Sequence, residues 1–260
     1  MEIQKVSKVF FSPTASTYKV LNLLTTTWSV PMVEFDLTCF VARKQTYNFA
    51  ASDFVVLGFP VYGGRIPAPM VTSMKQLQGN QTPVVLVATY GNRAYDDALL
   101  EGKTLLEEQG FVVVAAAAFV TEHSIMHSVA TGRPDAQDRL SIATFARQVW
   151  DKFTKLTLLE GLPRLTVKGN PHYREYKGVP LKPQTTSACT QCGLCVSNCP
   201  VNAISAANPR QTEEAVCISC LRCIQVCPVQ ARKLNKMLLF AAEKMFACKN
   251  SARQEPEIFL

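Results

Sequence analysis

The sequence lacks the features that mark secreted and membrane-spanning proteins. Its first residues, MEIQKVSKVFF, contain no long apolar run followed by a small-residue cleavage site, so no signal peptide is expected. The longest apolar run, FVVVAAAAFV, has about half the length that a membrane-spanning helix needs. We therefore expect a cytoplasmic protein with no transmembrane segment.

Two common nucleotide-binding motifs are also missing. No G-x-G-x-x-G follows the first apolar run, which disfavours a dinucleotide and leaves no nicotinamide-binding domain. The stretch EGKT at 101–104 is not a phosphate-binding P-loop, because Asp97 stands where the first glycine of that motif should be. The net charge is +7, but the basic residues are scattered and form no aromatic–basic stripe. Nucleic-acid binding is not expected.

The first 155 residues alternate short apolar runs with amphipathic stretches, which is typical of an α/β domain. Near-continuous apolar runs predict buried parallel strands at residues 6–11, 33–36, 54–59, 84–90 and 111–120. Two further groups of apolar residues fall at helical spacing and predict amphipathic helices. The first is Val20, Leu23, Leu24 and Trp28, and the second is Ile142, Phe145, Val149 and Phe153. Asp135 is a plausible N-cap and Gly110 a plausible C-cap. The prediction is a doubly wound, five-stranded sheet in the flavodoxin-like order 2-1-3-4-5.

The composition changes beyond residue 155. Residues 156–187 are rich in Pro, Gly and charge and are expected to form a linker. Residues 188–232 contain most of the cysteines. This segment is too short to build a large core without cross-links such as bound metals or disulfides. Residues 233–260 are expected to form a helix and tail, with one apolar face made of Leu234, Leu238, Ala241 and Met245. That face is expected to pack against one of the two domains, and a membrane surface is the alternative.

The cysteines form the most specific motif in the chain. Eight of the ten lie in two copies of C-x2-C-x2-C-x3-C-P, which begin at Cys189 and, 28 residues later, at Cys217. In a reducing compartment, clustered thiols indicate metal binding rather than disulfides. Zinc usually takes two C-x2-C pairs that are separated by a longer loop. The other two, Cys39 and Cys248, are expected to be buried core thiols.

This repeat resembles that of bacterial two-cluster ferredoxins, in which the fourth cysteine of each copy binds the other cluster. The resemblance implies an α+β domain with two [4Fe–4S] clusters. One cluster would be held by Cys189, Cys192, Cys195 and Cys227, and the other by Cys217, Cys220, Cys223 and Cys199. Pro200 and Pro228 would turn the chain after each crossing ligand, and Ala203 and Ala231 would let the backbone approach the sulfurs. A zinc-stapled or disulfide-stapled module is the alternative.

Three loops at the carboxyl ends of the predicted strands are candidates for a flavin site, because ligands bind at that edge of a doubly wound sheet. The first loop carries hydroxyls at a helix N-terminus, where a phosphate can bind. The other two place tyrosines beside glycines, which suits an aromatic ring system. The candidate residues are Ser12, Thr14, Ala15, Ser16, Thr17, Pro60, Val61, Tyr62, Gly63, Gly64, Arg65, Tyr90, Gly91, Asn92 and Tyr95. His123, which follows the fifth strand, is a candidate proton donor, and a structural role is the alternative.

The first loop resembles the flavodoxin phosphate loop T/S-x-T-G-N-T, with Ala15 and Ser16 in place of Gly-Asn. The loop PVYGGRIPAP (60–69) resembles the corresponding loop of flavodoxin-like quinone reductases. The whole chain is similar to flavodoxin–ferredoxin fusion proteins, sometimes called ferrodoxins. That resemblance implies FMN and two [4Fe–4S] clusters. These groups would add about −6 in charge, leaving the loaded protein at roughly +1.

The function expected on these grounds is relay of low-potential single electrons between the clusters and FMN. The partners would be redox proteins, and a homodimer is possible. The main alternative is an FMN-dependent reductase of a quinone, a tetrapyrrole or another small acceptor, fed by its own clusters. A third alternative is an iron–sulfur-stapled scaffold without flavin.

Overall fold

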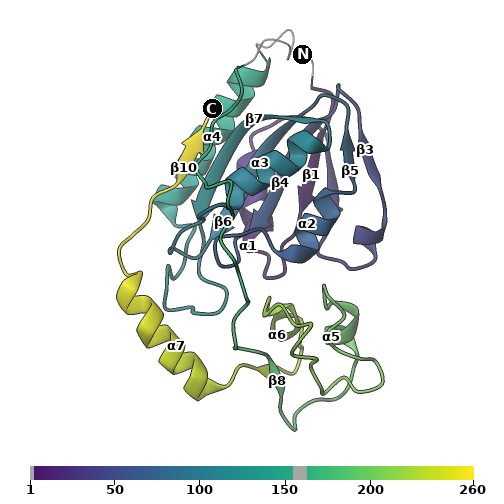
Figure 1. The fold of residues 1–260 in the computed structure, drawn as a ribbon, viewed down its shortest axis with the longest axis vertical. Helices are drawn as coiled ribbons and strands as arrows, with labels where there is room; N and C mark the ends of the chain where they lie inside the picture. The colour runs from purple at the N-terminus through teal and green to yellow at the C-terminus, as the bar shows by residue number, and fades with distance from the viewer. Residues whose placement is uncertain (1–2, 155–162) are drawn as a thin grey trace.

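The computed structural model describes residues 3–154 and 163–260 (Figure 1). A parallel sheet covered by helices forms the larger, N-terminal part of the molecule. A small cysteine-rich unit lies below it in the view of Figure 1, at the end of the sheet where α5 and α6 are labelled. The predicted boundary between the first domain and the linker, at residues 155 and 156, falls at the edge of the segment outside the described residues.

The main sheet contains the five predicted strands in the predicted order. The strands are β1 (Val6–Phe10), β2 (Met32–Asp36), β4 (Phe54–Pro60), β6 (Thr82–Tyr90) and β7 (Phe111–Val120). All of their pairings are parallel, and the spatial order is β2-β1-β4-β6-β7, which is the flavodoxin-like order. The sheet also has a sixth strand, β10 (Glu257–Phe259), which pairs antiparallel with β7. The sequence did not predict this strand, because three residues carry too little periodicity.

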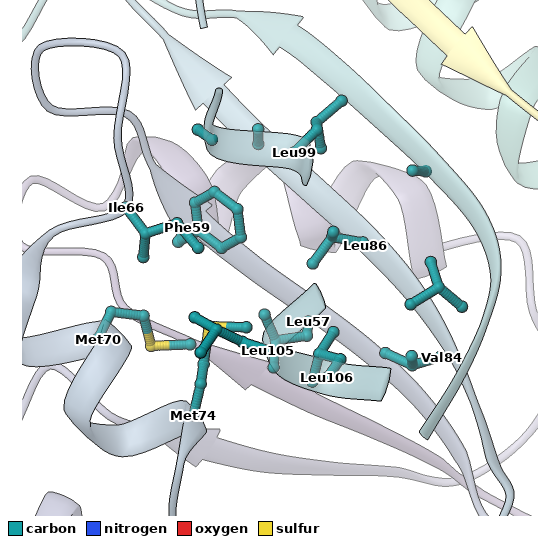
Figure 2. Close-up of a cluster of buried hydrophobic side chains, with 14 of the residues drawn as sticks. Leu57, Phe59, Ile66, Met70, Met74, Val84, Leu86, Leu99, Leu105 and Leu106 are labelled. Atoms are coloured by element: carbon teal, nitrogen blue, oxygen red, sulfur yellow. The ribbon is translucent and has the colours of Figure 1, made fainter. Parts of the chain in front are cut away.

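Both faces of the sheet are buried, which explains why its strands are almost continuously apolar. One face packs against α1 (Ser16–Thr25) and α4 (Ala136–Thr154). The other face packs against α2 (Ala68–Met74) and α3 (Ala98–Glu108). Figure 2 shows this second core, in which Met70 and Met74 from α2 and leucines from α3 meet strand residues such as Leu57 and Leu86. Two short strands, β3 (Tyr47–Phe49) and β5 (Leu77–Gly79), form a separate parallel pair, and a 3-10 turn spans Ala42–Lys44.

The predicted helix boundaries are confirmed at two places. The Asp135 carboxylate accepts a hydrogen bond from the Asp138 N–H (3.0 Å), and the Asp138 carboxylate accepts one from the Asp135 N–H (2.9 Å). This reciprocal pair satisfies donors that the start of α4 would leave free. Gly110 ends α3 with a positive φ of 83°, which a residue with a side chain rarely adopts.

The cysteine-rich unit reproduces the sequence repeat in its backbone. Each copy of the motif forms a one-turn helix, α5 (Leu194–Ser197) and α6 (Arg222–Gln225). Positive φ angles recur at a separation of 28 residues, in the pairs Gln191 and Ser219, Gly193 and Leu221, and Asn202 and Gln230. The ends of the unit pair antiparallel as β8 (Gln184–Thr185) and β9 (Arg232–Lys233). The two copies are therefore structural duplicates as well as sequence duplicates.

The described part of the linker, residues 163–187, runs along the first domain toward the cysteine-rich unit (Figure 1). The Asp97 carboxylate accepts hydrogen bonds from the N–H groups of Asn170 (2.9 Å) and Arg174 (2.7 Å). The Arg174 guanidinium also pairs with Asp96 (2.6 Å). These contacts tie the linker to the start of α3, so it follows a defined path over the first domain.

Helix α7 (Lys236–Lys249) corrects the prediction of its packing face. Its predicted packing face is turned outward, with Leu238 55% and Met245 69% exposed, and none of its residues is fully buried. The residues on its inner side include Leu239 and Phe246 instead. The expectation of buried core thiols is also wrong, because Cys39 and Cys248 are both exposed. A regular apolar spacing defines a helical face but does not say whether the fold covers it.

The C-terminal tail returns to the first domain and is anchored there by Asn92. The Asn92 amide donates hydrogen bonds to the carbonyls of Asn250 (2.8 Å) and Ala252 (2.9 Å), and its oxygen accepts one from the Gln254 N–H (3.1 Å). Tyr95 adds a hydrogen bond from its hydroxyl to Glu257 (2.9 Å). Asn92 is 4% exposed, so its amide cannot form hydrogen bonds with water, and these contacts with the tail take their place.

Replacing Asn92 with glycine should lower the free energy of unfolding by about 2–4 kcal/mol, because it removes a buried hydrogen-bond hub. Glycine suits the positive φ of 64° at this position, so the variant isolates the lost bonds from backbone strain. The measurements are urea unfolding and amide exchange at residues 257–259.

The matched control is Gln254→Ala, which keeps the backbone N–H that bonds to Asn92 and should leave stability within about 0.5 kcal/mol of the parent. Equal effects of the two substitutions would show that Asn92 does not anchor the tail.

Candidate functional site

The eight motif cysteines surround two separate cavities in the cysteine-rich unit. Cys189, Cys192, Cys195 and Cys227 line the first, which we call the first thiol cavity. Cys199, Cys217, Cys220 and Cys223 line the second thiol cavity. Each cavity therefore takes three cysteines from one copy of the motif and the fourth from the other copy. Within the described residues, no three His, Cys, Asp or Glu side chains are grouped closely enough to bind a single metal ion.

Backbone N–H groups point at sulfurs in the same way in both copies. The N–H of Ala203 lies 3.2 Å from Cys199 Sγ, and the N–H of Ala231 lies 3.2 Å from Cys227 Sγ. The close approach that the sequence predicted for these two alanines is present. Gln191 and Ser219 make the equivalent contacts with the first cysteine of each copy, at 3.4 and 3.5 Å. Donors at these positions stabilise negative charge on the sulfurs.

The two thiol cavities differ in exposure. Cys192, in the first set, is exposed, whereas Cys199, Cys220 and Cys223, in the second set, are buried. Burial raises the pKa of the Cys220 and Cys223 thiols to about 12. Metal binding at the second cavity must therefore displace thiol protons, which couples assembly of this site to pH.

A third cavity, which we call the edge cavity, lies at the carboxyl ends of the parallel strands and has a volume of about 210 Å³. The loops after β1, β4, β6 and β7 all contribute to it, as expected for a doubly wound sheet. Of the predicted flavin residues, it is lined by Thr14, Ser16, Pro60, Val61, Tyr62, Gly63, Gly64, Tyr90 and Gly91. A wider cleft of about 720 Å³ shares Thr14 and Ser16 with the edge cavity and continues along α1.

The second half of the chain supplies walls of the edge cavity that the sequence did not predict. Tyr176, Val179 and Leu181 enter from the linker, and Phe246 enters from α7. Ile218 and Ser219, which lie between Cys217 and Cys220 in the second thiol set, form another wall. No local sequence signal marks these residues, because they reach the cavity only through the docking of the two halves. The segment between two motif cysteines therefore borders the cavity directly.

The loop after β1 provides hydroxyl groups at the start of α1. Thr14 and Ser16 face the edge cavity, with their hydroxyl oxygens 3.3 Å apart. Ala15 adopts the positive φ of 62° that its place in the motif requires. Ser12 and Thr17 have structural roles instead. The Ser12 hydroxyl accepts from the Tyr18 N–H (3.0 Å), and the buried Thr17 hydroxyl bonds to that of Thr89 (2.7 Å).

The aromatic and glycine residues of the next two loops shape the cavity walls. Gly63 and Gly64 form a tight turn with positive φ angles of 59° and 89°, closed by hydrogen bonds between Tyr62 and Arg65. The Tyr176 ring packs against Gly63 so closely that an added Cβ would lie 2.0 Å from it. Burial raises the pKa of Tyr62 well above its ordinary value and that of Tyr90 to about 12, so both phenols are neutral.

Six of the predicted cofactor residues do not line the edge cavity, which are Ser12, Ala15 and Thr17 in the first loop and Arg65, Asn92 and Tyr95 in the next two loops. Arg65 forms a two-pronged ion pair with Glu101, at 2.8 and 2.6 Å, and packs over the Tyr173 ring. Asn92 and Tyr95 bind the C-terminal tail, as described above. The sequence placed them in the correct loops, but side-chain direction within a loop depends on tertiary partners.

Hydrogen bonds hold the cysteine-rich unit against the first domain. The Arg43 guanidinium donates to the Pro200 carbonyl, next to Cys199. In the other direction, Arg222 donates to the Pro13 carbonyl (3.3 Å) and Gln225 to the Thr14 carbonyl (3.4 Å). The second thiol cavity is therefore held beside the loop that carries the hydroxyls of the edge cavity.

Residues 188–231 match the family model of the 4Fe-4S dicluster domain. The matched segment contains both copies of the cysteine motif. The chain joins a flavodoxin-like fold to a 4Fe-4S dicluster domain. This organisation is that of the flavodoxin–ferredoxin fusions to which the sequence is similar.

Solved structures similar to the chain include several flavodoxins. One is a flavodoxin from the domain Archaea, with 13% identity and a TM-score of 0.38 over 58% of this chain and 99% of the other. Another is flavodoxin 2 from Bacillus cereus, with 15% identity and a TM-score of 0.42 over 57% and 99% of the two chains. A third is the Fusobacterium nucleatum flavodoxin bound to flavin mononucleotide, with 10% identity and a TM-score of 0.38 over 57% and 98%. Comparison with curated proteins gives no match. The fold assignment rests on strand order rather than on these likenesses.

Among the described residues, no helix combines the length and apolar character needed to cross a membrane.

His123 enters the edge cavity as a neutral ring. Its Nδ1 accepts hydrogen bonds from the N–H groups of Ile125 (3.2 Å) and Met126 (3.0 Å), so the neutral ring carries its proton on Nε2. It packs against Phe246 with ring centroids 5.0 Å apart. Burial, with a smaller contribution from His127, lowers the pKa of His123 to about 4. At neutral pH the ring is therefore uncharged. It can donate a hydrogen bond from Nε2, but it is poorly suited to act as an acid that gives up a proton.

The lowered pKa of His123 predicts a pH-dependent contribution to stability. Because the folded-state pKa lies below the unfolded value of about 6.5, this contribution is present above pH 6.5 and is lost as the pH falls toward 4. It should decrease by about 1 kcal/mol between pH 7.5 and pH 5.5.

The measurement is urea unfolding of the parent and of His123→Asn, which keeps an acceptor for the two N–H groups. The stability difference between them should shrink by that amount at the lower pH. A difference that stays constant over this range would contradict the assignment.

Proposed function

We propose that this protein transfers single electrons between two [4Fe–4S] clusters in the dicluster domain and an FMN bound in the edge cavity. The observation that carries the proposal is the shared wall. Ile218 and Ser219 border the edge cavity and lie between Cys217 and Cys220 of the second thiol set. A ring bound there would lie one short loop away from the second cluster.

The donor sets suit the proposed clusters. Four thiols line each cavity, three from one motif copy and one from the other, as in two-cluster ferredoxins. The paired N–H donors at Ala203 and Ala231 would stabilise the thiolate form of the two crossing ligands, Cys199 and Cys227. When bound, cysteine-ligated clusters carry one electron each, and a flavin exchanges one or two.

The residues of the edge cavity suit FMN. Thr14 and Ser16 would bind the phosphate together with the N–H groups of Ser16 and Thr17 at the start of α1. Tyr62 and Tyr90 would contact the ring, because neutral phenols provide apolar faces. His123 would donate its Nε2–H to a polar edge of the ring. The Fusobacterium flavodoxin, which is described as bound to flavin mononucleotide, has the same kind of fold.

The alternative function is reduction of a small acceptor by the flavin. The edge cavity is already narrowed by Tyr176 from the linker and Phe246 from α7, which favours electron transfer over binding of a second large molecule.

The partner that exchanges electrons with the clusters would be a redox protein that docks at the first thiol cavity. There Cys192 is exposed beside Leu194 and Val229, each 43% exposed. Formation of a homodimer stays a prediction.

Protein purified without oxygen should contain about eight iron and eight sulfide ions and one FMN per chain. The measurements are iron and acid-labile sulfide assays and release of the flavin by denaturation. Removing the hydroxyls in the double variant Thr14→Ala, Ser16→Ala should lower FMN occupancy and leave the iron content unchanged.

The control is the double variant Ser205→Ala, Ser251→Ala, in which both residues are exposed and neither lines the edge cavity. Zinc in place of iron, or iron without any flavin, would refute the proposal.

Replacing Arg43 with glutamine should slow electron transfer from the clusters to FMN. The substitution removes the charged donor to the Pro200 carbonyl, which weakens docking by about 1.5 kcal/mol, or roughly tenfold. Iron and flavin contents should stay at parent levels. The measurement is stopped-flow reduction of the flavin after the clusters receive electrons from a one-electron viologen donor.

Lys44→Gln is the matched control, because Lys44 is the neighbouring cation but lies over the Phe40 ring rather than at the docking contact. Equal rates in both variants and the parent would mean that this contact does not support the transfer.

A further inference from the structure

Arg232 is a buried cation within the dicluster domain. It is 2% exposed, and it has the largest side chain among the fully buried residues of the described chain. Arginine is almost never buried to this degree unless it is paired with an anion. Among residues 3–154 and 163–260, no carboxylate forms an ion pair with Arg232. Its charge is therefore not balanced by any acidic side chain within that part of the protein.

The guanidinium of Arg232 spans the walls of the two thiol cavities. Its Nη2 donates to the Pro209 carbonyl, and Pro209 lines the first thiol cavity, as Arg232 itself does. Its Nη1 donates to the Thr212 hydroxyl, and Thr212 lines the second thiol cavity. The cation thus lies between the two sites.

One donor of the buried guanidinium has no partner. The Nε atom is buried, and no acceptor lies within hydrogen-bond distance of it among the described residues. A buried charge with a free donor is costly unless an anion is close. The two thiol cavities are the places beside Arg232 where an anion would form, because a cysteine-ligated cubane carries a charge of about −2.

We propose that Arg232 is a buried counter-cation shared by the two clusters, and that its Nε–H donates a hydrogen bond to a sulfur at one of them. This inference rests on the proposed function. Each reduction adds one electron, and so one negative charge, to a cluster. A fixed positive charge in a poorly solvated site favours that added charge. Arg232 therefore raises the reduction potentials of both clusters, in addition to joining their walls.

A purely structural role makes a different prediction. If Arg232 only held Pro209 and Thr212 together, its removal would change stability or iron content but not the potentials of clusters that still assemble. The reduction potential is thus the property that separates the two roles.

The test uses the full-length, cluster-loaded protein and the variant Arg232→Gln. Iron and sulfide are counted first, and the clusters are then titrated with reductant and followed by electron paramagnetic resonance. At a fixed solution potential, the ratio of reduced to oxidised cluster should fall at least tenfold, a downward shift of about 59 mV for a one-electron couple. Arg232→Lys, which keeps the charge, should stay within about threefold of the parent ratio.

Arg210→Gln is the matched control. Arg210 lies in the same domain and donates to the Cys189 carbonyl (3.0 Å), but it is exposed to solvent. Water and salt screen an exposed charge, so its removal should change the ratio less than about threefold. A fully loaded Arg232→Gln protein with the parent potentials, or an equal shift in Arg210→Gln, would overturn the proposal.

A third variant decides the matter if Arg232→Gln does not assemble clusters. Thr212→Val keeps the cation but removes the hydroxyl that holds Nη1 between the two cavities. Because the charge is then held less closely to the clusters, the ratio of reduced to oxidised cluster should fall by between about threefold and tenfold with full iron content. An unchanged ratio in that variant would overturn the proposal. Parent protein without iron would instead refute the proposed function and not this inference in particular.

Discussion

The attachment of the dicluster domain to the first domain at both of its ends is the constraint on which the rest of the structure depends. On the N-terminal side, the linker is bound by Asp97 at the start of α3. On the C-terminal side, Asn92 holds the tail, and β10 completes the sheet beside β7. Because both connections end on the first domain, the dicluster domain is held against the carboxyl edge of the sheet and is not free on a flexible tether. The edge cavity exists in its observed form only because of this arrangement.

Docking also makes the two thiol sites different, although the motif repeats with identical spacing. The second site faces the first domain and has three buried cysteines, whereas the first site has an exposed cysteine at Cys192. Hydrogen bonding and solvent exposure both tune the potential of an iron–sulfur cluster. Two copies of one motif thus acquire different environments from their positions. An outer site with an exposed cysteine and an inner site beside the edge cavity suit transfer of electrons in sequence.

Buried and half-buried polar side chains fix the position of the second half of the chain. Asn92, Asp97 and Arg43 each use side-chain groups to bind backbone atoms of a segment more than seventy residues away. Such contacts specify position better than apolar packing, because an unpaired polar group in a buried site is costly. Apolar packing builds the two cores of the sheet, and these hydrogen bonds decide where the second half of the chain lies on it.

The sequence by itself determined the five strands and the separate cysteine-rich unit, through patterns such as the apolar runs at 54–59 and 84–90 and the repeat at Cys189 and Cys217. The flavodoxin-like strand order and the pairing of the motif copies came from the resemblance of these patterns to known families. Only the tertiary structure decided that Tyr176, Ile218 and Phe246 line the edge cavity, that Asn92 and Tyr95 bind the tail, and that α7 exposes its most regular apolar face. Local spacing reports which residues share a strand, a helical face or a ligand set. Contacts between segments far apart in the chain depend on how the two halves dock, and no local pattern encodes that.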